Sequence, residues 1–303
     1  PSILVGRGVL LHMIEFTYGM NSNIFITTSS QDYELLDSGD GYKLERFGSV
    51  VVSRPDPQVL WSKSRDFLWK DAHATFIKGW NGKKNIPDDW VITVEGITFS
   101  LRPASFKHVG IFPEQTPNWK WISEKIRKES REISVLNLFG YTGGASLAAL
   151  KAGAKVVHVD GSKISIGIAK ENAKRLNLSD ASIRFILDDA LAFAKREVRR
   201  GNTYDGIVMD PPAFGHGPDG EVWNIEKHLP ELIEVCKSLL SSKPLFLVVN
   251  GYAAGYSPIG YSNLLKSFLG QFGGKIEAGE LAIEESLSGR LLPAGICARW
   301  SSL

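Results

Sequence analysis

From residue 133 to the end of the chain, short apolar runs rich in β-branched residues alternate with longer amphipathic segments. Short runs of this composition are typical of buried strands, and the amphipathic segments have the apolar spacing of helices. The expected strands are residues 134–139, 155–159, 183–187, 206–209, 245–249, 275–283 and 295–301. The expected helices are residues 145–152, 162–176, 190–199, 224–240 and 261–272.

This alternation predicts a parallel sheet with helices packed on both faces. The last two expected strands have little helix between them, so we expect an antiparallel pair that closes one edge of the sheet. The predicted fold class is therefore α/β, with a doubly wound, Rossmann-like sheet of seven strands.

Residues 31–104 have a different pattern, in which short alternating runs are separated by turns that contain glycine. Residues 33–37 and 42–47 flank one such turn, and residues 90–94 and 97–101 flank another; both arrangements predict β-hairpins. We therefore expect a small β-rich domain at 31–104, followed by the α/β domain at 105–303. Residues 1–30 lack clear periodicity and are expected to be a tail or an extra piece of the small domain.

Composition narrows the class of protein further. Of the 303 residues, 43% are hydrophobic and 22% are charged, as is typical of a globular protein. No apolar run approaches the roughly 18 to 20 residues that cross a bilayer, which favours a cytoplasmic protein without a membrane partner. The net charge of +2 neither requires nor excludes nucleic acid. Cys236 and Cys297 lack metal-ligand spacing, so we expect buried thiols and no metal site.

A glycine-rich turn follows the first strand of the α/β domain. It runs Phe139-Gly140-Tyr141-Thr142-Gly143, directly before an expected helix. Glycine lets the backbone approach a ligand closely, and the start of a helix offers unpaired N–H groups. The spacing differs from the dinucleotide-binding G-x-G-x-x-G pattern. A tight turn that holds no ligand is the alternative interpretation.

Acidic residues stand at the ends of the second and third strands. Asp160 follows the second strand, where a carboxylate can accept both ribose hydroxyls of a nucleoside. Asp188 and Asp189 follow the third strand, where a carboxylate can accept the amino group of adenine. Each of these residues could instead cap the helix that follows it. Because the ends of parallel strands meet at one edge, their joint placement favours a nucleoside pocket.

The fourth strand ends in Asp210-Pro211-Pro212-Ala213-Phe214. The two prolines restrict the backbone, and the residue before a proline is held extended. Asp210 and the nearby carbonyl groups would then face a ligand at this edge, and Phe214 can stack on a planar target. A rigid loop that only ends the strand is the alternative.

These segments together resemble the class I S-adenosylmethionine-dependent methyltransferases. More narrowly, they are similar to the branch that contains the bacterial 23S ribosomal RNA methyltransferases of the large-subunit I and K types. The likeness covers residues 105–300 and includes residues 107–119, a segment that in this branch helps hold the methionine end of the donor. It implies the Rossmann-like methyltransferase sheet, S-adenosyl-L-methionine as cofactor and ribosomal RNA as partner.

The resemblance also implies roles for individual residues. Donor-binding roles fall to Gln115, Asn118, Phe139, Gly140, Thr142, Gly143, Asp160, Asp189 and Asp210. The catalytic set that faces the acceptor is Asp210, Pro211, Pro212 and Phe214.

The positions of the cysteines narrow the choice of the atom that accepts the methyl group. Methylation of carbon 5 of cytosine requires attack by a thiolate. In enzymes of this branch that carry it out, the cysteine lies in the proline motif or just after the fifth strand. Neither segment contains a cysteine here. We therefore expect a nitrogen acceptor, with RNA as the substrate on family analogy.

Other hypotheses about the function were weighed against RNA methylation, and two of them stay open. The acceptor could be a protein side chain or a small molecule, or the chain could be a catalytically silent RNA-binding module. A nicotinamide dehydrogenase is disfavoured because the first turn lacks its glycine spacing. The oligomeric state is not predicted. The small domain also contains a group of basic and aromatic residues, which could bind RNA by charge and stacking. Alternatively, the tryptophans could hold the domain together while the basic residues are solvated. The residues are Trp61, Lys63, Arg65, Trp69, Lys70, Lys78, Trp80, Lys83 and Lys84.

Overall fold

The computed structural model describes residues 23–82, 85–104, 106–177, 182–252 and 255–302. Its largest element is an eight-stranded sheet in the order β1-β16-β17-β15-β12-β9-β10-β11. The strands are β1 (Asn23–Thr27), β9 (Ser134–Leu138), β10 (Lys155–Asp160), β11 (Ile183–Leu187), β12 (Gly206–Met209), β15 (Phe246–Gly251), β16 (Lys275–Glu284) and β17 (Leu291–Ser301). β17 runs antiparallel to both neighbours, and the other pairs are parallel. The seven predicted strands are confirmed, and β1 is an addition to them.

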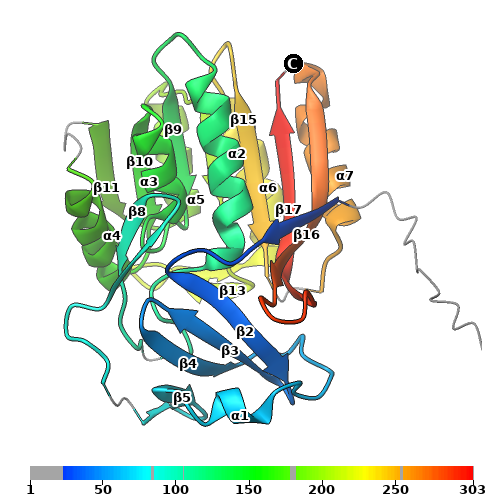
Figure 1. Cartoon of the computed structure of the whole chain (residues 1–303). Coiled ribbons are helices and arrows are strands. Elements are labelled where there is room, and N and C mark those ends of the chain that lie inside the picture. The colour runs from blue at the N-terminus through cyan, green and yellow to red at the C-terminus, as the bar shows by residue number, and fades with distance from the viewer. Residues whose placement is uncertain (1–22, 83–84, 105, 178–181, 253–254, 303) are drawn as a thin grey trace, which may run out of the picture.

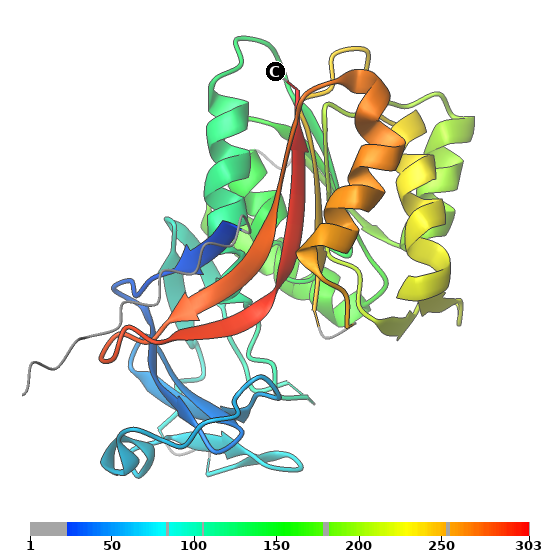
Figure 2. The same ribbon diagram turned by 90° about the vertical axis from the view of Figure 1, so that its right-hand side faces the viewer.

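Helices cover both faces of this sheet (Figure 2). They are α2 (Thr116–Arg127), α3 (Gly144–Lys151), α4 (Lys163–Arg175), α5 (Ala190–Arg199), α6 (Ile225–Ser238) and α7 (Pro258–Leu269). Successive strand residues enter opposite cores: Val135 and Val156 pack with residues of α2 and α3, whereas Leu136 and Val157 pack with residues of α5 and α6. Both faces are buried, which explains why the strands read as continuous apolar runs. The sequence pattern did not predict α2.

The small lobe, defined as residues 33–81, is a five-stranded sheet in the order β2-β3-β4-β5-β6. Its elements are β2 (Tyr33–Gly39), β3 (Tyr42–Phe47), β4 (Val50–Pro55), α1 (Asp66–Trp69), β5 (Ala74–Phe76) and β6 (Trp80–Asn81). The hairpin expected at 33–47 is confirmed as β2–β3. The carboxyl ends of the parallel strands point toward this lobe (Figure 1).

Two tryptophans of the small lobe direct their indole N–H groups inward. Trp61 Nε1 donates to Ser38 Oγ at 2.9 Å, and Trp69 Nε1 donates to Asp37 Oδ2 at 2.8 Å. Lys63 lies over the Trp69 ring, 4.4 Å from its centroid. The two indole rings are therefore tied into the lobe by hydrogen bonds. This agrees with the interpretation that the tryptophans hold the lobe together, which was the alternative to an RNA-stacking surface.

The second expected hairpin is confirmed as β7 (Val91–Val94) and β8 (Ile97–Ser100). It packs against α3 and α4 of the large sheet. The Ser100 N–H donates to Asn172 Oδ1 at 2.8 Å, and Lys151 Nζ donates to the Gly96 carbonyl at 2.9 Å. This hairpin therefore fastens the chain to the helices just before the large sheet begins.

Residues 23–27 form neither a tail nor a part of the small lobe, which corrects one expectation. They form β1, which pairs in parallel with β16 and extends the large sheet. The Thr27 hydroxyl donates to the Pro113 carbonyl at 3.1 Å and so ties this strand to the segment before α2. The partner strand lies some 250 residues away in sequence, so local periodicity carried no signal of the pairing. Residues 1–22, Lys83 and Lys84 lie outside the described residues.

The hairpin of β16 and β17 reaches from the large sheet to the small lobe (Figure 2). The Ser286 N–H donates to the Leu35 carbonyl at 2.9 Å, and an Arg290 N–H donates to the Ser38 carbonyl at 3.2 Å. These bonds hold the small lobe over the carboxyl edge of the large sheet.

Candidate active site

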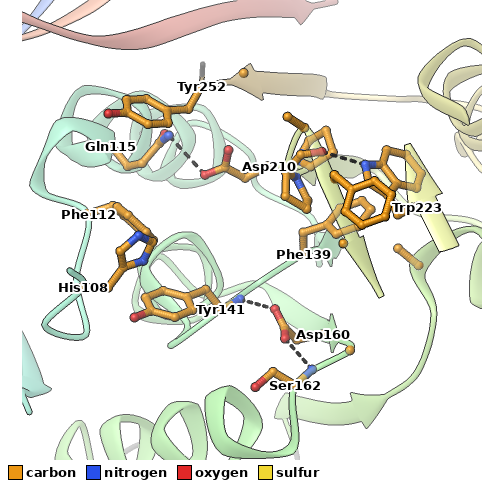
Figure 3. Close-up of a pocket in the computed structure, with 18 of the residues that line it drawn as sticks. His108, Phe112, Gln115, Phe139, Tyr141, Asp160, Ser162, Asp210, Trp223 and Tyr252 are labelled. Carbon is orange, nitrogen blue, oxygen red and sulfur yellow. Dashed lines mark hydrogen bonds between the residues drawn. The ribbon is translucent and has the colours of Figure 1, made fainter. Parts of the chain in front are cut away.

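A cavity of about 560 Å³ lies between the carboxyl ends of the parallel strands and the small lobe. Figure 3 shows its interior. The predicted residues that line it are Gln115, Phe139, Asp160, Asp189, Asp210, Pro211, Pro212 and Phe214. Gly140 and Thr142 line a smaller adjoining hollow together with Gln115 and Asp210. The volume falls in the range of small-molecule sites.

The glycine turn, residues 139–144, has a constrained backbone. Phe139 and Tyr141 have φ angles of 55° and 50°, a left-handed conformation that bulky residues rarely adopt. Between them, a Cβ on Gly140 would lie 2.4 Å from His158 Cε1. A Cβ on Gly144 would lie 2.2 Å from a ring carbon of Trp119. Only glycine fits these two close contacts, so the turn is held in one shape at the cavity.

Gly143 lies near the end of the glycine turn, outside the residues that line the cavity. Its φ is 99° and it is the residue before α3. A Cβ there would contact Leu147 and Ala169, which lie on α3 and α4, and Gly143 lines neither the cavity nor the hollow. Its conformation starts the helix, and it lies behind the ligand-facing surface.

Asp160 at the end of β10 receives two backbone N–H groups. Tyr141 N donates to its Oδ2 at 2.7 Å, and Ser162 N donates to its Oδ1 at 2.8 Å (Figure 3). Burial raises the pKa of this carboxyl, and the two N–H groups oppose the rise. Each oxygen keeps a further acceptor site. The carboxylate can therefore accept two hydroxyl groups from a ligand in the cavity.

The two acids after β11 both have intramolecular partners. Asp189 is the N-cap of α5 and accepts from Ala192 N at 2.7 Å. Asp188 forms an ion pair with Arg196. The capping alternative is thus observed for Asp189. The capping bond uses only Oδ1, and the residue also lines the cavity.

A chain of side-chain amides leads to Asp210 at the end of β12. Gln115 Nε2 donates to Asp210 Oδ2 at 3.2 Å (Figure 3). Behind it, Asn118 Nδ2 lies 2.9 Å from Gln115 Oε1 and 2.9 Å from Asn250 Oδ1. Asn118 is 1% exposed and does not line the cavity, and its hydrogen bond to Gln115 connects it to the residues that do.

Asp210 has the most unusual acidity at the site. Burial, and after it the charge of Glu114, raises its pKa to about 7. A carboxyl group with this pKa is close to half-ionised at neutral pH. It is therefore suited to accept a proton from a ligand in that range.

The proline pair after Asp210 leads into a short hairpin, β13 (Phe214–His216) and β14 (Val222–Asn224). Trp223 Nε1 donates to the Pro212 carbonyl at 2.7 Å, and the Trp223 ring lies 4.8 Å from that of Phe139. Trp223 thus joins the proline loop to the glycine turn (Figure 3). Phe214 is 58% exposed at the cavity. Sequence reasoning missed this hairpin and Trp223.

Sequence reasoning also missed the far side of the cavity, which we name the polar wall. It consists of Lys43, Arg54, Lys107, Glu114 and Tyr252. Lys43 and Arg54 stand opposite each other on β3 and β4. Like charges in that position are unfavourable. This pair of cations on adjoining strands was the signal that could have pointed to the wall.

Neither cysteine lies at the cavity, as expected. Cys236 on α6 is fully buried, and burial raises the pKa of its thiol. Cys297 on β17 is also fully buried and lies 3.3 Å from Asn118 Oδ1; burial raises its pKa to about 12. Both thiols are therefore protonated at neutral pH.

Across the residues that the structure describes, no group of three or more His, Cys, Asp or Glu side chains could hold a metal ion. In the same part of the chain, no helix is both long and apolar enough to span a bilayer.

The fold and the site define a family. The family model described as S-adenosylmethionine-dependent methyltransferase matches residues 71–250, more than half of the chain. The chain belongs to this family, whose members use S-adenosylmethionine as methyl donor. A SAM-dependent methyltransferase from Agrobacterium tumefaciens has a crystal structure that is 40% identical, with a TM-score of 0.90, over 94% of this chain and 95% of that chain.

The names of curated relatives point to ribosomal RNA methyltransferases. Ribosomal RNA large subunit methyltransferase I of Cronobacter sakazakii is 37% identical over 60% of this chain and 45% of that protein. Ribosomal RNA large subunit methyltransferase K/L of Shewanella frigidimarina is 34% identical over 50% of this chain and 21% of that protein. The chain therefore spans less than half of the length of these relatives.

Proposed function

We propose that this protein transfers a methyl group from S-adenosylmethionine to a nitrogen of a base in ribosomal RNA. The observation that carries the proposal is Asp210, a half-buried carboxyl with a pKa of about 7 that shares one cavity with Asp160. The names of the relatives support RNA as the acceptor. We also propose that the reaction takes place in the cytoplasm, where bacteria make their ribosomal RNA.

The cavity has groups suited to the donor. Asp160 would accept the ribose hydroxyls, because each of its oxygens has one backbone N–H and room for another donor. The free oxygen of Asp189 would accept the adenine amino group. Gln115, Phe139, Gly140 and Thr142 would lie along the methionine end, with Asn118 and Gly143 acting through their neighbours.

When bound, S-adenosylmethionine supplies a methyl group activated by a positively charged sulfur. The residues of the chain then need to align an acceptor and remove its proton. The Asp210 carboxylate would accept a hydrogen bond from the acceptor N–H and take the proton as the new N–CH₃ bond forms. Pro211 and Pro212 fix the carbonyl groups beside it, and Phe214 would cover the base at the cavity mouth.

The position of the thiols favours nitrogen over carbon 5 of cytosine. Attack on the cytosine ring needs a thiolate close to the base. Cys236 and Cys297 are fully buried away from the cavity, and burial raises the pKa of each. A nitrogen acceptor needs no such nucleophile, because its lone pair attacks the methyl group directly.

The proposal is tested with the whole chain and two assays. S-adenosylhomocysteine is titrated into the protein in a calorimeter, and total RNA from a strain lacking the protein is incubated with radiolabelled donor. We expect tight binding and label in ribosomal RNA, found as an N-methylated nucleoside by mass spectrometry. Binding without RNA labelling, together with labelling of a protein fraction, would favour a protein acceptor. Label on carbon 5 of cytosine would refute the nitrogen assignment.

A further inference from the structure

A buried arginine lies at the far end of the chain of amides that leads to Asp210. Arg299 on β17 is 6% exposed. Its guanidinium carbon lies 3.9 Å from the centre of the Phe25 ring of β1 and 5.0 Å from the centre of the Trp121 ring of α2. Its Nη2 forms an ion pair with Glu277 of β16 at 3.1 Å. Residues of three elements thus hold the guanidinium in one place.

The position of this guanidinium is costly for the fold. Burial lowers the pKa of Arg299, and Nε has no hydrogen-bond partner among the described residues. A buried charge with an unpaired donor is unfavourable, and an apolar side chain of similar length could pack between the same two rings without that cost. The charge at this position therefore needs an explanation beyond packing.

The third nitrogen of the guanidinium faces Asn118. Arg299 Nη1 lies 3.5 Å from Asn118 Oδ1, and Cys297 Sγ lies 3.3 Å from the same oxygen. An amide has nearly the same shape in either orientation, so its neighbours decide which end is oxygen. A thiol can donate or accept weakly, whereas a guanidinium has five donors and no acceptor. Arg299 therefore fixes the oxygen of Asn118 on this side.

This orientation passes through a second amide to Asp210. Asn118 Nδ2 donates to Gln115 Oε1 at 2.9 Å and to Asn250 Oδ1 at 2.9 Å. Gln115 must then turn Nε2 toward Asp210, to which it donates at 3.2 Å (Figure 3). We name the side chains of Asn118 and Gln115 the amide relay. Among the side chains hydrogen-bonded to Asn118 in the described part of the chain, that of Arg299 alone has no acceptor.

Asp210 does not set the direction of the amide relay from the other end. Its pKa of about 7 leaves it partly protonated at neutral pH. A carboxylate accepts from an amide N–H, whereas a protonated carboxyl can donate to an amide oxygen. If Gln115 turned its oxygen to Asp210, the protonated form would be favoured. A protonated Asp210 could not take a proton from the acceptor.

We propose that Arg299 is a positioning residue that holds Asp210 ready to accept a proton. It acts through Asn118, which keeps the N–H₂ group of Gln115 turned toward that carboxylate. The role of Asp210 in this proposal rests on the proposed function, but the direction of the amide relay can be tested without RNA. The strand β1 also gains a part in the site, because Phe25 lies against the guanidinium.

The test follows the protonation of Asp210 in the whole protein, by the carbon-13 signal of its carboxyl group, assigned with Asp210→Asn. In Arg299→Met, the pKa of Asp210 should rise by about one unit, because the carboxylate loses a fixed N–H donor. Asn118→Leu retains the arginine and interrupts the amide relay, so it should cause the same rise. The double variant should show no further rise, because both changes remove one interaction.

The matched control is Lys125→Met. Lys125 also lies against the Trp121 ring, 5.4 Å from its centre, but its Nζ donates to Ser301 Oγ at 2.9 Å. This variant removes a neighbouring cation and leaves the amide relay intact. The titration of Asp210 should therefore match that of the unaltered protein.

Other titratable groups near Asp210 do not confuse this comparison. They are Glu114 of the 3₁₀ helix η1 (Pro113–Gln115), Tyr261 of α7 and Cys297 of β17. Burial raises the pKa of the Tyr261 hydroxyl, and it raises that of the Cys297 thiol to about 12, so both stay protonated. Glu114 is present in every variant, so its charge acts equally on each.

Methylation rates provide a second readout. Single-turnover rates are measured between about pH 5.5 and 9, with RNA from a strain lacking the protein. In Arg299→Met the profile should move up by about one pH unit, so the rate at about pH 6 should fall about tenfold. Near the high-pH plateau the rate should approach that of the unaltered protein. A purely structural role would lower the rate by one factor at every pH and leave the midpoint in place.

The outcomes distinguish this proposal from the proposed function. An unchanged titration of Asp210 in Arg299→Met would overturn the proposal, and so would single shifts that add together in the double variant. An unaltered protein that methylates no RNA would refute the proposed function, whereas shifted titrations in its variants would still establish the amide relay. Asn118→Leu carries the test if thermal melting shows that Arg299→Met does not fold.

Discussion

The two sides of the cavity are built in different ways. The donor side, formed by the glycine turn and the ends of β10 and β11, comes from consecutive strands of one sheet, and its acids Asp160 and Asp189 are held by backbone N–H groups. The polar wall comes from distant segments of the chain, and its cations Lys43 and Arg54 are held by the carboxylates of Asp56 and Glu45. A local strand-to-helix turn can therefore specify the donor side, whereas the wall exists only after the two sheets have packed together.

This difference also appears in the family match. The model covers residues 71–250 and so includes the donor side. It does not include β3 and β4, which carry Lys43 and Arg54. The family match therefore covers the donor side but leaves three of the five residues of the polar wall, Lys43, Arg54 and Tyr252, outside it. Variants on the two sides should accordingly separate donor binding from turnover.

The largest effect is expected where the two sides meet, at Asp210. Asp210→Ala should lower the single-turnover rate of methyl transfer by about 10³-fold, because the variant lacks the group that orients the acceptor and takes its proton. Affinity for S-adenosylhomocysteine should stay within about threefold of the unaltered protein, by calorimetry. Normal turnover would show that Asp210 does not act on the acceptor. Asp210→Asn provides a variant of nearly the same shape.

A change on the donor side should act on binding. Asp160→Ala should weaken S-adenosylhomocysteine about 100-fold, because it removes a charged acceptor and releases the N–H groups of Tyr141 and Ser162. The control is Asp66→Ala, which alters an exposed aspartate of α1 and should leave affinity unchanged. Unchanged affinity in Asp160→Ala would remove the ribose role.

The pH dependence should reveal Asp210 directly. Below pH 7 the carboxyl is protonated and cannot accept a proton, so kcat/KM should rise about tenfold per pH unit and level off above about 7. Burial lowers the pKa of His108 and of His158 to about 4, so neither histidine titrates in this window. Initial rates across the range provide the measurement. A flat profile between about pH 5.5 and 7 would exclude Asp210 as the base.

The smallest effect is expected at the cysteines. Cys236→Ser and Cys297→Ser should each keep activity within about twofold, because neither thiol lines the cavity and both are protonated. Methylation assays and thermal melts on both variants provide the check. Lost activity in a folded variant would restore a thiolate mechanism.

Much of the donor side was predictable from local sequence. The turn at Gly140 and the acids Asp160, Asp189 and Asp210 all follow apolar strands, and parallel strands bring their carboxyl ends to one edge. The structure places these residues around the cavity and its adjoining hollow. The pattern could not show that Asn118 would be buried behind Gln115, since that depends on how α2 packs against the sheet.

The sequence by itself determined seven strands of the large sheet, the helices between them and the order of the residues along its carboxyl edge, because the local pattern of apolar and polar residues records each strand, helix and turn. Tertiary structure alone decided three other features: the pairing of β1 with β16, the contact of Trp223 with the proline loop, and the gathering of Glu114, Lys43 and Arg54 on one wall of the cavity. β1 and β16 are more than 200 residues apart, the polar wall needs the small lobe packed over the sheet, and the Trp223 contact needs the loop after β12 folded back on itself. Contacts of these kinds leave no trace in the local periodicity of the chain.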